Sequence, residues 1–255
     1  MSILLLGLLV TSGLAHGQPL TNQLARNCKE VQRMGGTKTA VYTIQTNSGT
    51  HNVLCDQQTN GGGWTVVQQR FDGAIRFWNR NWNEYRNGFG TPGLMESFYA
   101  GNELIHELTN QFDDNSTLRI EIYGDRNPGS QHANDFYFSE YYFRLNDEKS
   151  EYEAAIFIDW QHLVGNASTG WYDITYSNGV KFSTIDHNND PDPDCQQIFH
   201  LGGWWTHYCG LISLNGEYTP RKFGDGYGLF FTVAGQFRRE SKDHTNDGER
   251  SRNKI

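Results

Sequence analysis

The sequence predicts a fold of short strands joined by many turns, with few and short helices. Aromatic residues make up 14% of the 255 residues, and 28 residues are glycine. Aromatic residues favour strands, whereas glycine and asparagine favour turns. Apolar and polar residues also alternate in Leu118–Tyr123, as in a strand with one face in the core. The length suits one substantial domain or two small ones.

The first residues have the features of a secretory signal peptide, residues 1–17. An apolar run from Ile3 to Val10 precedes small residues, with cleavage expected near Gly17. A buried N-terminal strand is the alternative. Residues 18–27 then form a short polar leader. No later segment reaches the roughly 18 apolar residues that a transmembrane helix needs, so we expect a secreted, extracellular protein.

Secretion bears on the oxidation state of the four cysteines, which are Cys28, Cys55, Cys195 and Cys209. An even set in an oxidising compartment predicts two disulfides. The sequence alone leaves all three pairings open, although local closure favours Cys28 with Cys55 and Cys195 with Cys209. No CxxC motif supports a zinc or thioredoxin-like site. Two N-glycosylation sequons, at Asn115 and Asn166, suit a secreted surface.

Most of the ordered structure is expected to be strand. Ala40–Ile44 and His51–Cys55 flank an Asn-Ser-Gly turn, which predicts a hairpin closed by cysteines, and Cys28–Cys55 is expected to hold two or three short strands. Asn102–Leu108 has the pattern of a short capped helix. Phe71–Gly93 is expected to be a loop that contributes aromatic rings to the core. Further strands are expected at residues 64–70, 118–123, 133–145, 153–160 and 228–234, with a hairpin over 174–182.

The sequence lacks the residue sets of common enzymes and of nucleic-acid binding. There is no GxSxG motif, no cysteine left over as a nucleophile and no EF-hand spacing, so we expect a protein that is not an enzyme. The net charge of −8 and the lack of a basic stripe argue against a nucleic-acid partner. No Gly-X-Y run or heptad repeat predicts a collagen stalk or coiled coil. A homo-oligomer formed through other contacts is left open.

The stretch from Asp186 to Tyr218 is the strongest candidate for a functional loop. Its prolines and closely spaced carboxylates cannot continue a helix or a central strand, and long loops in compact domains are usually functional or disordered. Ca²⁺ prefers carboxylate, amide and carbonyl oxygens on a bent loop. The candidate ligands are Asp186, Asn188, Asp190 and Asp192. A solvated acidic loop stiffened by proline is an equally good interpretation.

Several motifs together resemble the fibrinogen C-terminal domain family of fibrinogen-related proteins. The match follows the family's order from Cys28 to about Arg239. The most specific motifs are GGGWTV at residues 61–66, GWW at 203–205 and LNGEY at 214–218. The others are Asn27-Cys28, Val53–Asp56, Asp72-Gly73, Gly88–Gly90, Gly101-Asn102, Leu118-Arg119 and Phe182–Thr184.

The resemblance implies an α+β fold. It comprises a small N-terminal β-unit, a central and mostly antiparallel sheet with short helices, and a loop-rich C-terminal subdomain that holds ligand and calcium. The domain would span residues 28–240. The charged composition of residues 241–255 predicts a polar, disordered tail. The resemblance also implies both local disulfides and a calcium ion in the acidic loop.

In ficolin-like and tachylectin-like members, a pocket beside the second disulfide binds acetylated sugars through backbone around a cis peptide bond. Here that bond would be Tyr208-Cys209. The residues that the resemblance places at this pocket are Trp205, His207, Tyr208, Cys209 and Tyr218.

The sequence departs from the family pattern at both sites. Two aspartates of the family's calcium loop correspond to Asn188 and Asp190, so calcium binding is expected to be weakened. The histidine after the second loop cysteine is Gly210 here. The segment between Tyr218 and Gly226 is short, and the residues that wall the acetyl pocket are missing from it.

Two functions are therefore considered. The first is a secreted carbohydrate-binding lectin, ficolin-like and non-enzymatic, that recognises acetylated sugars on microbial or cell-surface glycans in innate immunity. The second is a fibrinogen-like module that has lost sugar binding and binds a protein. Its partner would be a receptor, a matrix component or a haemostasis factor, in a venom or saliva setting. The shortened pocket favours this second function.

Overall fold

The computed structural model describes residues 24–111, 116–124, 131, 134–158, 163–168, 173–220, 226–231 and 250–254. The expected signal peptide, the sequon at Asn115 and residues 241–249 of the expected tail lie outside these ranges. Within them, no helix is long and apolar enough to cross a bilayer. The fold is the expected α+β arrangement, with a nine-stranded sheet and a second sheet of two strands.

The large sheet follows the order β1-β2-β3-β11-β6-β7-β8, and β4 and β5 extend it beside β3. Every strand pair in it is antiparallel. Its strands are β1 (Ala40–Thr46), β2 (Gly49–Asp56), β3 (Trp64–Arg70), β4 (Phe89–Gly90), β5 (Phe98–Tyr99), β6 (Ser116–Tyr123), β7 (Phe136–Leu145), β8 (Ala154–Phe157) and β11 (Arg250–Lys254). The small sheet pairs β9 (Ile212–Ser213) with β10 (Phe230–Phe231).

The helices are short and lie between these strands. The α-helices are α1 (Cys28–Arg33), α2 (Trp82–Asn87), α3 (Asn102–Thr109) and α4 (Asp194–Gln197), and the 3-10 helices are η1 (Thr59–Gly61), η2 (Glu148–Ser150) and η3 (Ile174–Ser177). The expected helix at Asn102–Leu108 is confirmed as α3, one residue longer.

The N-terminal unit begins with a helix, where strand was expected. The Asn27 side chain accepts a hydrogen bond from the backbone N–H of Glu30 and so caps α1. The hairpin that follows is confirmed, with Ala40 opposite Cys55 and Thr46 opposite Gly49. The disulfide between Cys28 and Cys55 is also confirmed, and it fastens α1 to β2.

Strand β11 corrects the expectation of disorder for residues 250–254 of the tail. Residues 250–254 pair with β3 on one side and β6 on the other, in the middle of the sheet. The charged composition predicted disorder, but a strand with neighbours on both sides satisfies its backbone N–H and C=O groups whatever its side chains are. The register also places Arg252 opposite Glu121 of β6. Residues 250–254 are therefore part of the large sheet, although they lie beyond the expected boundary at 240.

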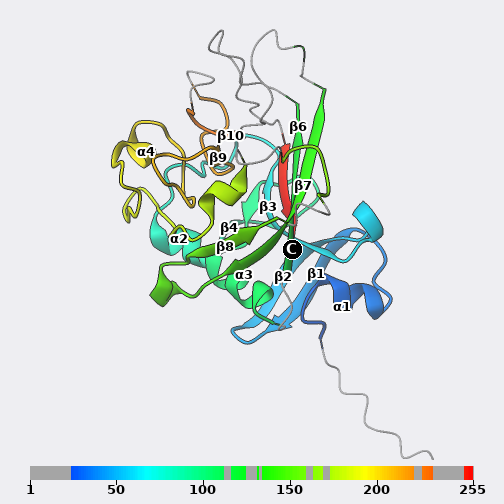
Figure 1. Cartoon of the computed structure of the whole chain (residues 1–255). Coiled ribbons are helices and arrows are strands. Elements are labelled where there is room, and N and C mark those ends of the chain that lie inside the picture. Colours follow the sequence, from blue (N-terminus) through cyan, green and yellow to red (C-terminus); the bar gives the residue numbers. More distant parts are fainter. Residues whose placement is uncertain are drawn as a thin grey trace, which may run out of the picture.

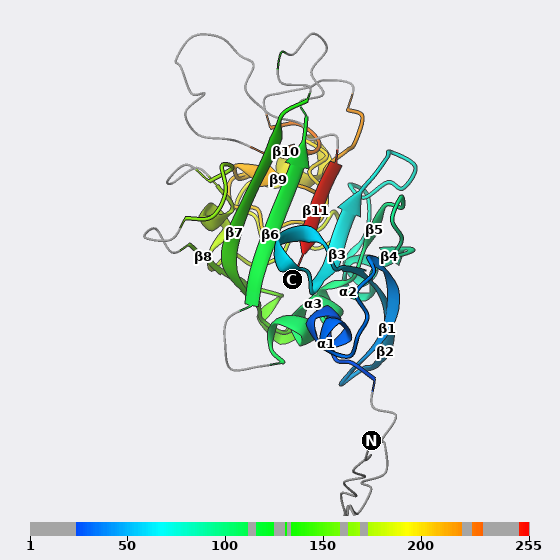
Figure 2. The same ribbon diagram turned by 90° about the vertical axis from the view of Figure 1, so that its right-hand side faces the viewer.

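The two faces of the sheet differ in what they pack against. Figure 1 shows the segment that carries α4, β9 and β10 on one side of the sheet, and Figure 2 looks onto the opposite face. Alternate residues of β6 and β7 point to the covered side and are fully buried, as Ile120 and Phe143 are. They belong to one core cluster with Phe182, Trp204 and Trp205.

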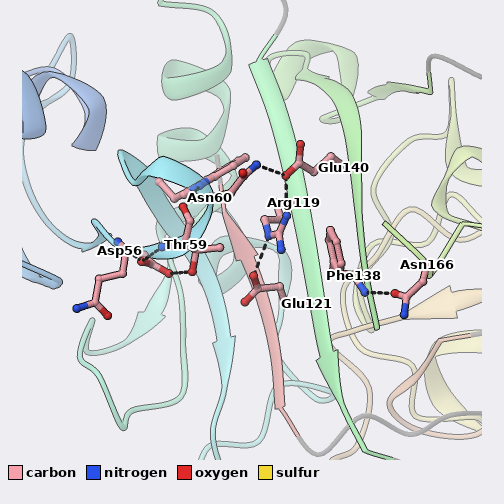
Figure 3. Close-up of polar contacts among 10 residues, drawn as sticks. Asp56, Thr59, Asn60, Arg119, Glu121, Phe138, Glu140 and Asn166 are labelled. Atoms are coloured by element: carbon pink, nitrogen blue, oxygen red, sulfur yellow. Dashed lines mark hydrogen bonds and ion pairs between the residues drawn. The ribbon is translucent and has the colours of Figure 1, made fainter. Parts of the chain in front are cut away.

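The face of the large sheet opposite to α4, β9 and β10 carries a buried ion network, and η1 is hydrogen-bonded to it. Arg119 Nε lies 2.8 Å from Glu121 Oε1, and its Nη1 lies 2.6 Å from Glu140 Oε1. The guanidinium carbon also stands 4.1 Å from the ring centroid of Phe138. Asn60, which belongs to η1, donates to the same Glu140 oxygen at 3.2 Å, as Figure 3 shows. Breaking one partner of such a buried network typically costs about 3–5 kcal/mol.

Two local expectations are wrong because capping side chains were overlooked. The expected loop Phe71–Gly93 contains α2, which Asn81 and Glu84 start with a capping box. The expected hairpin over 174–182 begins instead with η3. There Asp173 Oδ1 accepts from the Thr175 N–H at 2.8 Å and favours a helical turn.

The position of β11 predicts that its removal abolishes folding. A chain that ends at Glu249 leaves β3 and β6 without their shared partner. We expect a loss comparable with the whole stability of a domain, about 5–15 kcal/mol. Secreted yield and thermal unfolding measure this loss, and a chain lacking only Ile255 is the control. Equal melting temperatures for the two chains would contradict the central position of β11.

Candidate functional site

The acidic loop is organised by its own backbone. The Asp190 carboxylate is buried and accepts three backbone hydrogen bonds. Oδ1 accepts from the N–H groups of Asp192 and Tyr208, both at 2.9 Å, and Oδ2 accepts from the N–H of Cys209 at 3.0 Å. Hydrogen bonds to a carboxylate are about twice as strong as neutral ones. Asp190 therefore clamps the acidic loop to the backbone that precedes Gly210.

The clamped backbone has an uncommon conformation. Tyr208 and Cys209 have φ values of +49° and +62°, in the left-handed region that non-glycine residues rarely adopt. Each such residue costs on the order of 1–3 kcal/mol and persists only where its surroundings hold it. Asp190 and the confirmed disulfide between Cys195 and Cys209 do so here. The expected cis bond at Tyr208-Cys209 is wrong, because the described residues contain no cis peptide.

This backbone presents a cluster of exposed rings, here called the loop-tip cluster and formed by Tyr176, His207 and Tyr208. The Tyr208 side chain is 66% exposed, and Tyr176 is 45% exposed. The His207 ring lies 4.8 Å from the Tyr208 ring and 6.3 Å from the Tyr176 ring, centroid to centroid. Rigidly held, exposed aromatic residues are typical anchors of protein interfaces.

Trp205 is placed differently from the expectation that it lines a pocket. It is 4% exposed and belongs to the main core cluster. Its indole Nε1 donates to the backbone oxygen of Tyr152 at 2.7 Å, and its ring meets Phe182 edge-on at 5.1 Å. Its polar atom is satisfied inside the domain, so Trp205 supports the loop from beneath and is not a ligand contact.

Tyr218, another expected ligand residue, lines a separate cavity of about 630 Å³. The Trp78 and His200 rings stack at 4.0 Å in its wall, and His200 Nδ1 lies 2.8 Å from Glu217 Oε2. Tyr227 and Arg76 also line the cavity. The volume falls within the usual range of ligand sites. Sequence reasoning missed Trp78 and Tyr227, because they come from segments far apart in the chain and share no motif. It also missed Glu217, although this residue lies within the LNGEY motif.

Polar contacts hold the start of the acidic loop against α2 and η2. Asp186 Oδ1 accepts from the Trp82 backbone N–H at 2.8 Å. The Trp82 indole donates to Glu148 at 2.9 Å, and this bond, together with the Arg86 guanidinium, holds the pKa of Glu148 below its usual range. Lys181 and, to a lesser extent, His187 lower the pKa of Glu151 in the same way. These carboxylates are charged at neutral pH and fasten the loop to the domain.

The four expected calcium ligands do not present one shared set of oxygens in this arrangement. Asp190 already accepts three hydrogen bonds, Asn188 Oδ1 accepts from the Asp190 N–H at 3.0 Å, and Asp192 Oδ1 accepts from the Asp194 N–H at 3.0 Å. In the described part of the chain, only Asp192, Cys195 and Cys209 bring three potential metal-binding atoms together, and both cysteines are in the disulfide. Calcium binding at these residues stays a prediction from the sequence.

Comparison with known proteins agrees with this fold. Residues 24–234 match the family described as "Fibrinogen beta and gamma chains, C-terminal globular domain". The chain belongs to this family. It is 35% identical over 205 residues to angiopoietin-4 from Bos taurus, a match that covers 79% of this chain and 37% of that protein. It is also 35% identical over 201 residues to angiopoietin-2 from Mus musculus, covering 77% of this chain and 37% of that protein. The chain thus spans well under half the length of these relatives.

Solved structures show the same likeness. The fibrinogen-like globe domain of human ANGPTL2 superposes with a TM-score of 0.73 at 26% identity, covering 90% of this chain and 97% of that one. Lamprey fibrin D-dimer, complexed with the peptide ligand Gly-His-Arg-Pro-amide, superposes with a TM-score of 0.68 at 26% identity. That match covers 92% of this chain and 74% of that one.

The clamp predicts a large effect of Asp190→Asn. The amide nitrogen would face one of the three backbone donors, so we expect a loss of about 3 kcal/mol in the free energy of unfolding. Asp192→Asn is the matched control, because it keeps an oxygen for its single described bond, and we expect it to cost less than about 1 kcal/mol. Urea unfolding with calcium and with a chelator measures both variants. A loss confined to the calcium-containing sample would contradict the clamp and support a bound calcium ion.

Proposed function

We propose that this chain is a secreted, non-enzymatic binding module that recognises a protein partner through the loop-tip cluster. One observation carries the proposal: Tyr208 is largely exposed, yet a buried carboxylate and a disulfide hold its backbone in a costly conformation. Strained backbone that the surroundings must hold in place clusters at functional sites. The outcome here is an aromatic ring fixed before any partner arrives.

The choice of a protein partner over a glycan follows from the family and the site. The lamprey relative is described with a bound peptide, so this fold can present a peptide-binding surface. Two features expected of the acetyl-sugar pocket are not found: Trp205 is buried, and the described residues contain no cis peptide at Tyr208-Cys209. Lectin activity and a role in innate immunity therefore rank second. Secretion is supported by the sequence of the first residues and by the two closed disulfides.

The proposal predicts that Tyr208→Ala impairs cell binding. We expect labelled, secreted protein to bind cultured cells of the source organism and to lose about 30-fold in affinity with this change, because truncating an interface anchor typically costs 2 kcal/mol or more. Tyr142→Ala is the matched control, since Tyr142 is an exposed tyrosine on β7, away from the loop.

Two treatments distinguish a protein partner from a glycan. Mild proteolysis of the cell surface should abolish binding, and free N-acetylglucosamine should leave it unchanged. Retention on an N-acetylglucosamine resin, or competition by the free sugar, would overturn the proposal in favour of the lectin function. Equal affinities of the Tyr208→Ala and Tyr142→Ala proteins would show that the loop-tip cluster is not the contact surface.

A further inference from the structure

The sequon Asn166-Ala167-Ser168 lies along the part of β7 that extends beyond β8, which pairs only with residues 142–145 of β7. The proposed function makes no use of it. Asn166 Oδ1 accepts from the Phe138 backbone N–H at 2.9 Å, and its Nδ2 donates to the Phe136 backbone oxygen at 3.1 Å. Figure 3 shows the first of these bonds, with the Asn166 side chain directed at Phe138. The side-chain amide of Asn166 thus forms the hydrogen bonds that a neighbouring strand would otherwise form with the backbone of Phe136 and Phe138.

Neighbouring contacts fix this segment against the strand. The backbone N–H groups of Asn166 and Ala167 both donate to the Phe138 oxygen, at 2.8 and 2.9 Å. Gly165 forms an isolated bridge with Ser139 and has a φ of +110°. A side chain at Gly165 would place its Cβ 2.1 Å from the Phe138 oxygen, so only glycine allows this approach.

The third sequon residue is also held by the fold. The Ser168 side chain is 3% exposed, and its hydroxyl donates to the Asp173 carboxylate. Asp173 in turn caps η3. The sequon is therefore anchored at its asparagine by β7 and at its serine by the cap of a helix, and it does not form a free surface loop.

The stereochemistry of the amide makes its bond to Phe136 incompatible with a glycan. The Asn166 amide nitrogen carries two hydrogens, one on the same side of the C–N bond as Oδ1 and one on the opposite side. Because Oδ1 and Nδ2 both face β7, the hydrogen on the Oδ1 side is the one that bonds to the Phe136 oxygen. N-glycosylation replaces one amide hydrogen with a sugar carbon. In a planar secondary amide, the carbon attached to nitrogen lies on the same side of the C–N bond as the carbonyl oxygen, as the next Cα does in a trans peptide. The opposite arrangement, which corresponds to a cis peptide, is strongly disfavoured. The sugar would occupy the position of the Phe136 contact.

We propose that Asn166 is not a glycosylation site of the folded protein. Its unmodified amide closes the edge of β7, and the sequon stays silent in the secreted form. The sequence-based expectation of a glycan at this position is thereby replaced by a structural role. The proposal is independent of the proposed function, because the loop-tip cluster shares no residue with this segment.

Glycan occupancy gives the direct test. The Asn115→Gln variant removes the other sequon, and it is secreted from eukaryotic cells and purified in folded form. We expect its intact mass to equal that of the polypeptide and to be unaffected by peptide-N-glycosidase. A glycosidase-sensitive peptide that contains residue 166, recovered from the purified folded protein, would overturn the proposal.

A pair of substitutions tests the role of the amide. Asn166→Asp removes the donor and sets a carboxylate oxygen against the Phe136 oxygen, so we expect a lower melting temperature. Asn178→Asp is the matched control, because Asn178 is also exposed and its described side-chain bond, from the Ile156 N–H to Oδ1 at 2.9 Å, needs only an acceptor. Equal melting temperatures for the two variants would overturn the structural role of the Asn166 amide.

Discussion

The Asp190 carboxylate accepts hydrogen bonds from three backbone amides, and the acidic loop, the disulfide and the exposed Tyr208 all take their positions from it. A buried carboxylate is costly to desolvate unless several donors surround it. Two of the three donors here, the N–H groups of Tyr208 and Cys209, belong to residues in an uncommon backbone conformation. The same three hydrogen bonds therefore offset both the desolvation of the carboxylate and the strain of the backbone.

The acidic loop is held in place by core residues and by contacts with α2 and η2. Trp205 precedes the loop-tip residues His207 and Tyr208 in the sequence. It lies in the core and is held there by its hydrogen bond to the Tyr152 backbone oxygen. Trp82, Glu148 and Asp186 fasten the beginning of the acidic loop to α2 and η2. A binding surface that is already ordered has less conformational entropy to lose when a partner arrives. This arrangement suits a module whose contact residues lie on loops supported by a rigid sheet.

Sequence reasoning predicted α3 and most strands, because alternation and capping residues are local signals. The α+β fold and the pairing of the cysteines were implied by the resemblance to the family. Sequence reasoning failed at β11, whose charged residues carry no strand signal and whose pairing is entirely non-local. At the site it named Asp190, Tyr208 and Tyr218 among the important residues. It could not foresee that Trp205 packs in the core, or that Trp78 and His200 stack in the wall of a cavity, since only the tertiary fold brings those segments together.

The middle position of β11 also constrains how the protein is made. During synthesis β3 and β6 emerge long before residues 250–254, so the centre of the sheet stays open while most of the chain already exists. Pairings of such long sequence separation form slowly and leave strand edges exposed to aggregation. The hairpin of β1 and β2 and the local disulfides can form early, because their partners lie close in sequence. The central pairings of the sheet therefore cannot form until residues 250–254 have been synthesised.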